Sequence, residues 1–323
     1  MSNIGRLFGL CAAVSMIVAA CQATGPPQEK RGDLREGADE HEDRKAEMSR
    51  DANNTLLWNA GSVEADFMAR IRALQELGHT RDRSLIPALK ELLGRPSPGP
   101  ELSAKNWDAQ AAERVIDLHI IESLHALGDD SEVHRIVGLV KQAGTVLTGP
   151  YNELRNAASV IAAVGRAEAV VGLVAATADL DPVVVRNAVV VLDQLALPAA
   201  PVHQDVSRIP RLSDSVTFTH HTLKEEFEGL ASLSHGAITL SPGVQQLVAT
   251  GSYDRQSIRR ESVKLSYIVE RILPVLDLDY FVQDDHIVIC TYAEAGLRWR
   301  DWWKEHGGDL VYQGESATFA LRK

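Results

Sequence analysis

Aromatic residues and cysteines are both scarce in this chain of 323 residues, with aromatics at 5% and only three cysteines. A shortage of Tyr and Phe disfavours an all-β sandwich, because strands are enriched in aromatic and β-branched residues. The hydrophobic fraction is an ordinary 45%, mostly Ala, Val and Leu, which suits packed helices. The formal net charge of −11 argues against nucleic acid as a partner, because phosphates need a basic surface.

The local motifs of common enzymes are missing as well. The sequence has no Gly-x-Ser-x-Gly nucleophile elbow, no His-Glu-x-x-His, no P-loop, no Gly-x-Gly-x-x-Gly and no Cys-x-x-Cys. We therefore expect no enzymatic activity and no cofactor, although a catalytic triad needs no local motif.

Histidines and a run of carboxylates are the remaining candidates for a metal site, and we expect no metal at either. His220 and His221 are neighbours on an expected strand, so their side chains face opposite sides. The carboxylate run from Glu36 to Asp43 lacks the spacing of an EF-hand loop. Three further histidines are interpreted as residues of helix surfaces: His119, His125 and His134.

The first 21 residues have the organisation of an export signal. Arg6 provides the positive region, and an apolar stretch follows from Leu7 to Ala20. That stretch is shorter than the roughly 20 residues that a membrane-spanning helix needs. It ends in the sequence VAAC at residues 18–21, which resembles the lipobox of bacterial lipoproteins. The alternative is an ordinary signal peptide with a chance cysteine.

The lipobox resemblance implies that Cys21 is the lipidation acceptor and becomes the acylated first residue. Several acyl chains anchor a protein stably, so the mature chain would stay on its membrane. An Asp after the cysteine would resemble the inner-membrane retention signal, and Gln22 stands there instead. The resemblance thus implies a lipid-anchored protein of the cell envelope, at the outer membrane and facing the periplasm.

Neither of the other two cysteines is expected to form a disulfide. Cys11 leaves with the signal, so Cys290 has no partner for an internal disulfide. Cys290 follows the apolar residues Ile287–Ile289, and we interpret it as a small buried hydrophobe on a strand rather than a reactive thiol.

After the signal, residues 22–60 are expected to be a disordered tether. They contain Pro26-Pro27 and a dense charge run, with few apolar side chains to offset the entropy of ordering.

Residues 61–200 then show a helical pattern that repeats. In three units an amphipathic helix is followed by a glycine, a polar turn and a second apolar helix. The glycines are Gly78, Gly128 and Gly165, and we expect each to end its helix in the left-handed conformation.

These units resemble the HEAT repeat and its short bacterial relatives. The intervals between the glycines bracket the 40 to 47 residues or so that are typical of such repeats, and Arg95–Pro100 is expected to be an inserted loop. A fourth half-unit begins at Pro182. The resemblance implies an α-solenoid whose concave face binds other proteins, since each helix pair must stack on its neighbours to bury its apolar face.

A different pattern follows over residues 212–293, where strand-like and helical runs alternate. Strands are expected at 216–219, 237–240, around 258, 278–282 and 287–289, with helices from Thr222 and over 265–276. Ser241-Pro242-Gly243 is expected to stop the second strand, and residues 243–254 to form a loop. The order βαβ-βαββ resembles the N-terminal short domain of secretins and TonB-linked receptors. That family implies strand edges or ring-forming contacts.

The last part, residues 294–323, holds a tryptophan cluster. Trp299, Trp302 and Trp303 occupy one face of an expected helix, which resembles the closing segment of bacterial HEAT-repeat lipoproteins. They suit either a core anchor or a sugar-stacking platform, and we favour the core anchor. A short strand is expected at 310–312.

Together these observations predict an α + α/β protein: a HEAT-type α-solenoid, a small α/β domain and a Trp-rich helix. The expected function is that of a lipid-anchored envelope scaffold or adaptor that binds unidentified envelope proteins, and the secretin-like module leaves a homo-oligomer open. The alternative is a ligand sensor or glycan binder that uses the Trp cluster or a cleft between domains. A relative of the HEAT-like bilin lyases is disfavoured by the export signal, because bilin attachment is intracellular.

Overall fold

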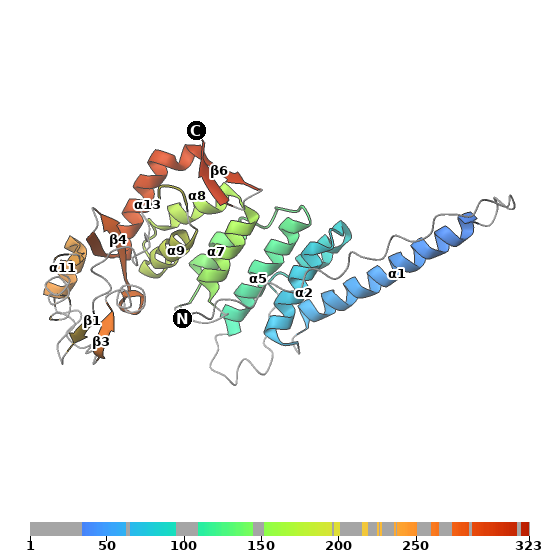
Figure 1. The fold of residues 1–323 in the computed structure, drawn as a ribbon, viewed down its shortest axis with the longest axis horizontal. Coiled ribbons are helices and arrows are strands. Elements are labelled where there is room, and N and C mark those ends of the chain that lie inside the picture. The colour runs from blue at the N-terminus through green and yellow to red at the C-terminus, as the bar shows by residue number, and fades with distance from the viewer. Residues whose placement is uncertain are drawn as a thin grey trace, which may run out of the picture. The chain divides into compact units, whose positions relative to one another are not determined.

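The chain divides into two compact units, Met1–Asp51 and Ala52–Lys323. The computed structural model describes residues 34–62, 65–94, 109–144, 152–195, 197–200, 215–218, 225, 227, 236, 238–250, 260–264, 273–283, 286–314 and 318–322. In these residues the protein is mostly helical, with a small mixed sheet and a C-terminal helix (Figure 1).

The first helix differs from the tether expected over residues 22–60. α1 (Leu34–Gly61) is 28 residues long. Its residues are mainly Ala, Glu, Arg, Lys, Leu and Met, which have high helix propensity, and the prolines all lie outside it. A strongly polar composition argues against burial but does not argue against a helix, so the charge run was not sufficient ground for disorder. Residues 22–33 lie outside the described part.

A series of helices then forms the larger part of the second unit. These are α2 (Phe67–His79), the 3₁₀ turn η1 (Arg83–Leu85), α3 (Ile86–Leu92), α5 (Ala109–Ala126), α6 (Arg135–Lys141), α7 (Glu153–Val164), α8 (Ala167–Ala176) and α9 (Pro182–Gln194). α2 packs on α5, α5 on α7, and α7 on α9, while α3 packs on α5, and α6 and α8 pack on α9. Figure 1 shows α2, α5 and α7 side by side in this order.

Polar side chains mark the starts of several of these helices. The side chain of Asp66 accepts hydrogen bonds from backbone N–H groups in the first turn of α2, and Asn152 does the same for α7. Asp181 caps α9, whose first residue, Pro182, tolerates that position because its missing N–H would be unpaired there. These caps satisfy donors that a helix start leaves without intrahelical partners.

The three glycines expected to end helices behave in two ways. Gly165 follows α7 with φ +65°, and Gly128 follows α5 with φ +84°, both left-handed as expected. Gly78 instead lies inside α2, which continues to His79, so the expectation is wrong there. Its missing side chain serves close packing: a Cβ at Gly78 would come within 3.2 Å of the Cα of Ser123 on α5.

Between residues 215 and 291, the described strands form two small sheets. They contain β1 (Ser215–Phe218), β2 (Ile238–Leu240), β3 (Arg260–Lys264), β4 (Leu278–Gln283) and β5 (His286–Thr291). One sheet has the order β2-β5-β4, with β2 parallel to β5 and β4 antiparallel to it. β1 pairs with β3 in a separate antiparallel sheet. The expected strands are therefore largely present, but they are not joined in one βαβ-βαββ sheet.

The helices of this half differ more from the expectation. α11 (Pro242–Ala249) begins at the residues expected to stop β2 and start a loop. Ser241 caps it through a hydrogen bond from the N–H of Val244, and Pro242 occupies the first helical position. The helix expected from Thr222 falls mostly outside the described residues. Of the one expected over 265–276, the described end is a 3₁₀ turn, η5 (Leu273–Leu276).

The C-terminal helix α13 (Tyr292–His306) joins the two halves. It packs on α8 and α9 and also on β4 and β5, so one apolar core extends from α7–α9 into the C-terminal part. The 3₁₀ turn η6 (Gly307–Asp309), β6 (Leu310–Gln313) and β7 (Thr318–Leu321) follow, and β6 and β7 pair as a hairpin. The boundaries expected near residues 200 and 294 thus do not separate independent cores.

One carboxylate, that of Glu294, organises the starts of both α11 and α13. It accepts hydrogen bonds from the N–H and the hydroxyl of Thr291, the N-cap of α13, at 2.9 and 3.0 Å. It also accepts from the hydroxyl of Ser241 at 2.6 Å and from the N–H of Gly243 at 2.9 Å. Burial alone would raise the pKa of Glu294, but these hydrogen bonds outweigh it and the pKa lies below its ordinary value.

Candidate functional site

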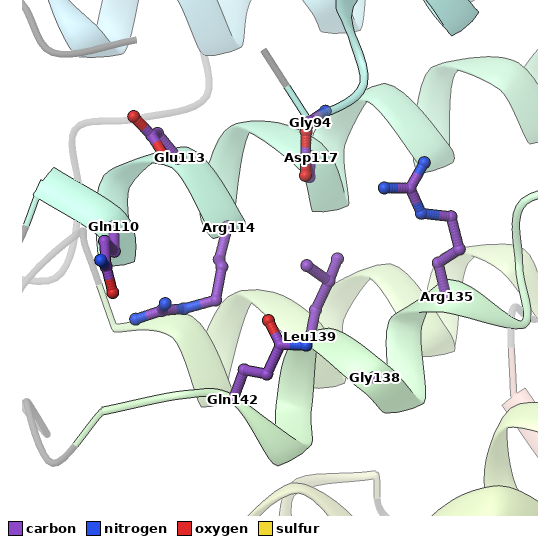
Figure 2. Close-up of a pocket in the computed structure, with 9 residues that line it drawn as sticks. All are labelled: Gly94, Gln110, Glu113, Arg114, Asp117, Arg135, Gly138, Leu139 and Gln142. Carbon is purple, nitrogen blue, oxygen red and sulfur yellow. Dashed lines mark hydrogen bonds between the residues drawn. The ribbon is translucent and has the colours of Figure 1, made fainter. Parts of the chain in front are cut away.

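A polar pocket between α5 and α6 is the candidate site (Figure 2). Its volume is about 550 Å³, which is within the range of small-molecule sites. The residues that line it are Gly94, Gln110, Glu113, Arg114, Asp117, Arg135, Gly138, Leu139 and Gln142. Figure 2 shows that Arg114 and Asp117 come from α5, whereas Arg135 and Leu139 come from α6 and Gln142 follows its end.

Asp117 is the most deeply placed charged group of this pocket. Its relative exposure is 9%, and its Oδ1 accepts a hydrogen bond from the N–H of Gly94 at 3.0 Å. Burial raises the pKa of Asp117, and the hydrogen bond from Gly94 and the positive charge of Arg135 oppose this only in part. The pocket therefore contains a carboxylate whose charge the folded protein stabilises poorly.

Arg114 forms the wall nearest to α7 through a buried ion pair. Its Nε donates to Oε1 of Glu153, and Oε2 of Glu153 accepts from the N–H of Gly144 at 2.9 Å. Glu153 is in the first turn of α7, where a negative charge interacts favourably with the helix dipole. This arrangement connects α5, α7 and the end of α6, and so gives the pocket a fixed wall.

Arg135 forms the opposite wall and is more exposed. Its guanidinium is 3.6 Å from the carboxylate of Glu132, and 37% of its side chain is exposed. A third arginine, Arg70 of α2, is not among the residues that line the pocket; it is buried and donates from Nε to the carbonyl of Ala60 at 3.0 Å. Burial lowers the pKa of Arg70, while the negative charges of Glu113 and Asp117 act in the opposite direction. Carboxylates and guanidinium groups together equip the pocket to bind a polar ligand.

The tryptophan cluster of α13, for which a core anchor and a sugar-stacking platform were both considered, belongs to the core. Trp299 and Trp302 are 1% and 4% exposed, and Trp303 is half-buried against the same core. The indole N–H of Trp299 donates to Asp193 of α9 at 2.9 Å, and that of Trp302 donates to the carbonyl of Pro198 at 3.3 Å. The indole rings of Trp299 and Trp302 are therefore not accessible to a sugar, and the cluster anchors α13.

The cysteines and histidines named in the sequence analysis are either buried, or more exposed, or outside the described residues. Cys290 is fully buried on β5, and burial raises the pKa of its thiol, which disfavours the reactive thiolate. His119 is buried rather than on a helix surface, with Nδ1 2.8 Å from Glu122. His125 and His134 are more exposed. Cys21, His220 and His221 lie outside the described residues.

The pocket residues were not among the residues singled out in the sequence. One signal was present: Asp117 interrupts a run of apolar residues on the buried part of α5, from Val115 to Leu118. A charged residue within such a run is seldom buried without a partner. The cavity itself, however, arises from the way α5 and α6 pack and has no local sequence pattern.

No family model, no curated protein and no solved structure matches the chain. Among the described residues, no helix is long and apolar enough to cross a membrane, and no group of three or more His, Cys, Asp or Glu side chains is arranged to hold a metal ion.

Proposed function

We propose that this protein is a lipid-anchored adaptor of the bacterial cell envelope, which binds a partner protein through its helical series. In this proposal Cys21 carries the lipid, the helices from α2 to α9 form a HEAT-type solenoid, and the pocket between α5 and α6 is part of the binding surface. The mature chain would act without catalysis, at the outer membrane and on the periplasmic side.

The observation that carries the proposal is the polar pocket within a series of consecutively packed helices. Extended helical arrays bind partners along their surfaces, and their successive units bury a common core. Here α2, α5, α7 and α9 pack one on the next, and the pocket opens between α5 and α6, which packs on α9. Its charged side chains suit recognition of a polar surface rather than burial of an apolar one.

The C-terminal part fits this function as an end cap of the helical series. Terminal units of repeat arrays need a cover for the apolar face that has no further neighbour. Trp299 and Trp302 bury their rings in the core they share with α9, and Arg300 donates to the carbonyl of Thr177 after α8 at 2.5 Å. A glycan-binding role for the tryptophans is not proposed, because Trp299 and Trp302 are buried.

Site-specific photo-crosslinking in intact cells tests the proposal. A photoreactive amino acid at Gln142, an exposed residue that lines the pocket, should give an adduct of defined mass with a protein of the envelope. The matched control carries the same amino acid at Lys304, whose side chain on α13 is 76% exposed. We expect an adduct at the first position and none at the second.

Two results would count against the proposal. Adducts of the same mass and yield at both positions would indicate non-specific collision rather than a binding surface. The absence of any adduct at Gln142, in cells where the protein is anchored and folded, would mean that the pocket does not face a partner.

A further inference from the structure

A polar network leads from the end of α6 to the start of β4, and its centre is formed by Arg186 and Asn187 of α9. Asn187 is fully buried, and its Nδ2 donates to the carbonyls of Val140 and Ala143 at 3.1 and 2.9 Å. Both carbonyls belong to the end of α6, where a helix needs acceptors' partners from outside its own regular pattern. Asn187 therefore attaches the end of α6 to α9.

Arg186 fixes the direction in which the amide of Asn187 points. Its Nε and Nη2 donate to Oδ1 of Asn187 at 3.4 and 3.2 Å, so the amino group of that amide faces α6. Its Nη1 donates to Oδ1 of Asp277 at 3.0 Å, at the residue between η5 and β4. The side chain of Arg186 is 7% exposed and that of Asp277 is 70% exposed. The ion pair thus connects a buried network to a carboxylate at the surface.

Asp277 is held in a conformation that residues with a side chain seldom adopt. Its φ is +54°, which lies in the left-handed region. Aspartate is tolerated there better than most residues, but strain of this kind persists only where the surrounding contacts hold the residue in place. The ion pair with Arg186 is such a contact.

The end of α6 is also a wall of the candidate pocket. Gly138, Leu139 and Gln142 line the pocket, and they lie directly before and after Val140, which accepts from Asn187. A change in the hold of α9 on this short stretch would therefore change the shape of the pocket.

We propose that the Arg186–Asp277 ion pair couples this wall of the pocket to the C-terminal sheet, so that the wall keeps its shape only while β4 is docked. Relaxation of Asp277 out of the left-handed conformation would break the pair, release Asn187 from its fixed orientation and loosen the end of α6. The inference rests on the proposed function and adds a way to regulate the same site.

Hydrogen exchange of the purified full chain, followed by mass spectrometry, tests this coupling. The reporters are amides at the end of α6: the N–H of Gln142 donates to the carbonyl of Gly138 at 3.2 Å, and that of Gly144 donates to Glu153 at 2.9 Å. Asp277→Gly removes the acceptor, while glycine tolerates the left-handed conformation. We expect the reporter amides to exchange at least about tenfold faster in this variant, because the end of α6 then opens without first breaking the network.

Ala199→Gly is the matched control. Ala199 also has a left-handed φ, of +53°, and its methyl side chain makes no ion pair. The substitution relieves the same kind of strain and adds the same freedom to the unfolded chain, so exchange at the end of α6 should not change. If Asp277→Gly does not fold, Asp277→Asn keeps a neutral acceptor and should accelerate the same amides by a smaller factor.

Two results would overturn the inference. Unchanged exchange at the end of α6 in Asp277→Gly would show that the ion pair does not act on the pocket wall. Equal acceleration of amides in α2 and at the end of α6 would show a general loosening of the fold instead of a coupling.

The photo-crosslink at Gln142 separates this inference from the proposed function. In cells, Asp277→Gly should lower the adduct yield several-fold and Ala199→Gly should leave it unchanged. An adduct of equal yield in the natural chain and in Asp277→Gly contradicts the inference and leaves the adaptor function standing. Faster exchange at the end of α6, with no adduct even in the natural chain, supports the coupling and contradicts the adaptor function.

Discussion

Replacement of Gly165 by alanine is expected to destabilise the protein for two separable reasons. Gly165 ends α7 with φ +65°, a conformation that an L-residue with a side chain rarely adopts. A Cβ at this position would also overlap the ring of Tyr312 on β6. The hydroxyl of Tyr312 donates to the carbonyls of Ala162 and Ala163 at 3.0 and 3.3 Å, in the last turn of α7.

The two contributions can be given magnitudes. The left-handed conformation costs a residue with a Cβ about 1–2 kcal/mol. Displacement of the Tyr312 ring would break its hydrogen bond to the end of α7, which contributes about 1 kcal/mol, and would disturb its edge-to-face contact with Phe319. We therefore expect Gly165→Ala to reduce the free energy of unfolding by about 2–4 kcal/mol.

A double-mutant cycle measured by urea denaturation tests this reasoning. In a Tyr312→Ala background the overlap is gone, so Gly165→Ala should cost only the conformational part, about 1–2 kcal/mol. Gly138→Ala is the matched control: this glycine lies inside α6 with no neighbouring atom near its Cβ position, so alanine should be neutral or stabilising. An equal cost of Gly165→Ala in both backgrounds would refute the role of Tyr312.

Two further predictions concern Glu294 and Cys21. Because its hydrogen bonds hold the pKa of Glu294 below the ordinary 4.5, the stability it contributes is present above that pH and is lost as the pH falls through the lowered value. Glu294→Gln should lower the unfolding temperature at neutral pH and reduce its decline in acid; a decline as steep as that of the natural chain would contradict this. Cys21→Ser should release the protein from membranes, and a variant that still fractionates with membranes after a salt wash would contradict the lipid anchor.

Local signals predicted much of the helical half. The start of α9 at Pro182, the apolar periodicity and the left-handed glycines Gly128 and Gly165 are all determined by short stretches of chain. Gly78 shows the limit of this reasoning. Its role is a close approach between α2 and α5, and such a contact depends on a partner far away in the sequence.

The elements that were missed or misread depend on context that a short segment does not contain. A polar segment such as residues 34–61 is compatible with both disorder and an exposed helix. Ser241-Pro242 suits a helix start as well as a strand stop, so the sequence predicts a loop where α11 forms. The pairing of β1 with β3 joins segments about 45 residues apart, and the cavity beside Asp117 exists only after α5 and α6 have packed.

The position of α13 has a consequence for how the chain responds to proteolysis. This helix contributes to the same apolar core as α9 while it also covers β4 and β5, so both halves of the chain are held together by packing as well as by the backbone. A single cleavage between residues 200 and 215 should leave two fragments that remain bound as a non-covalent complex. Neither fragment is expected to be soluble alone, because separation would expose the indole rings of Trp299 and Trp302 on one side and the apolar surface of α9 on the other.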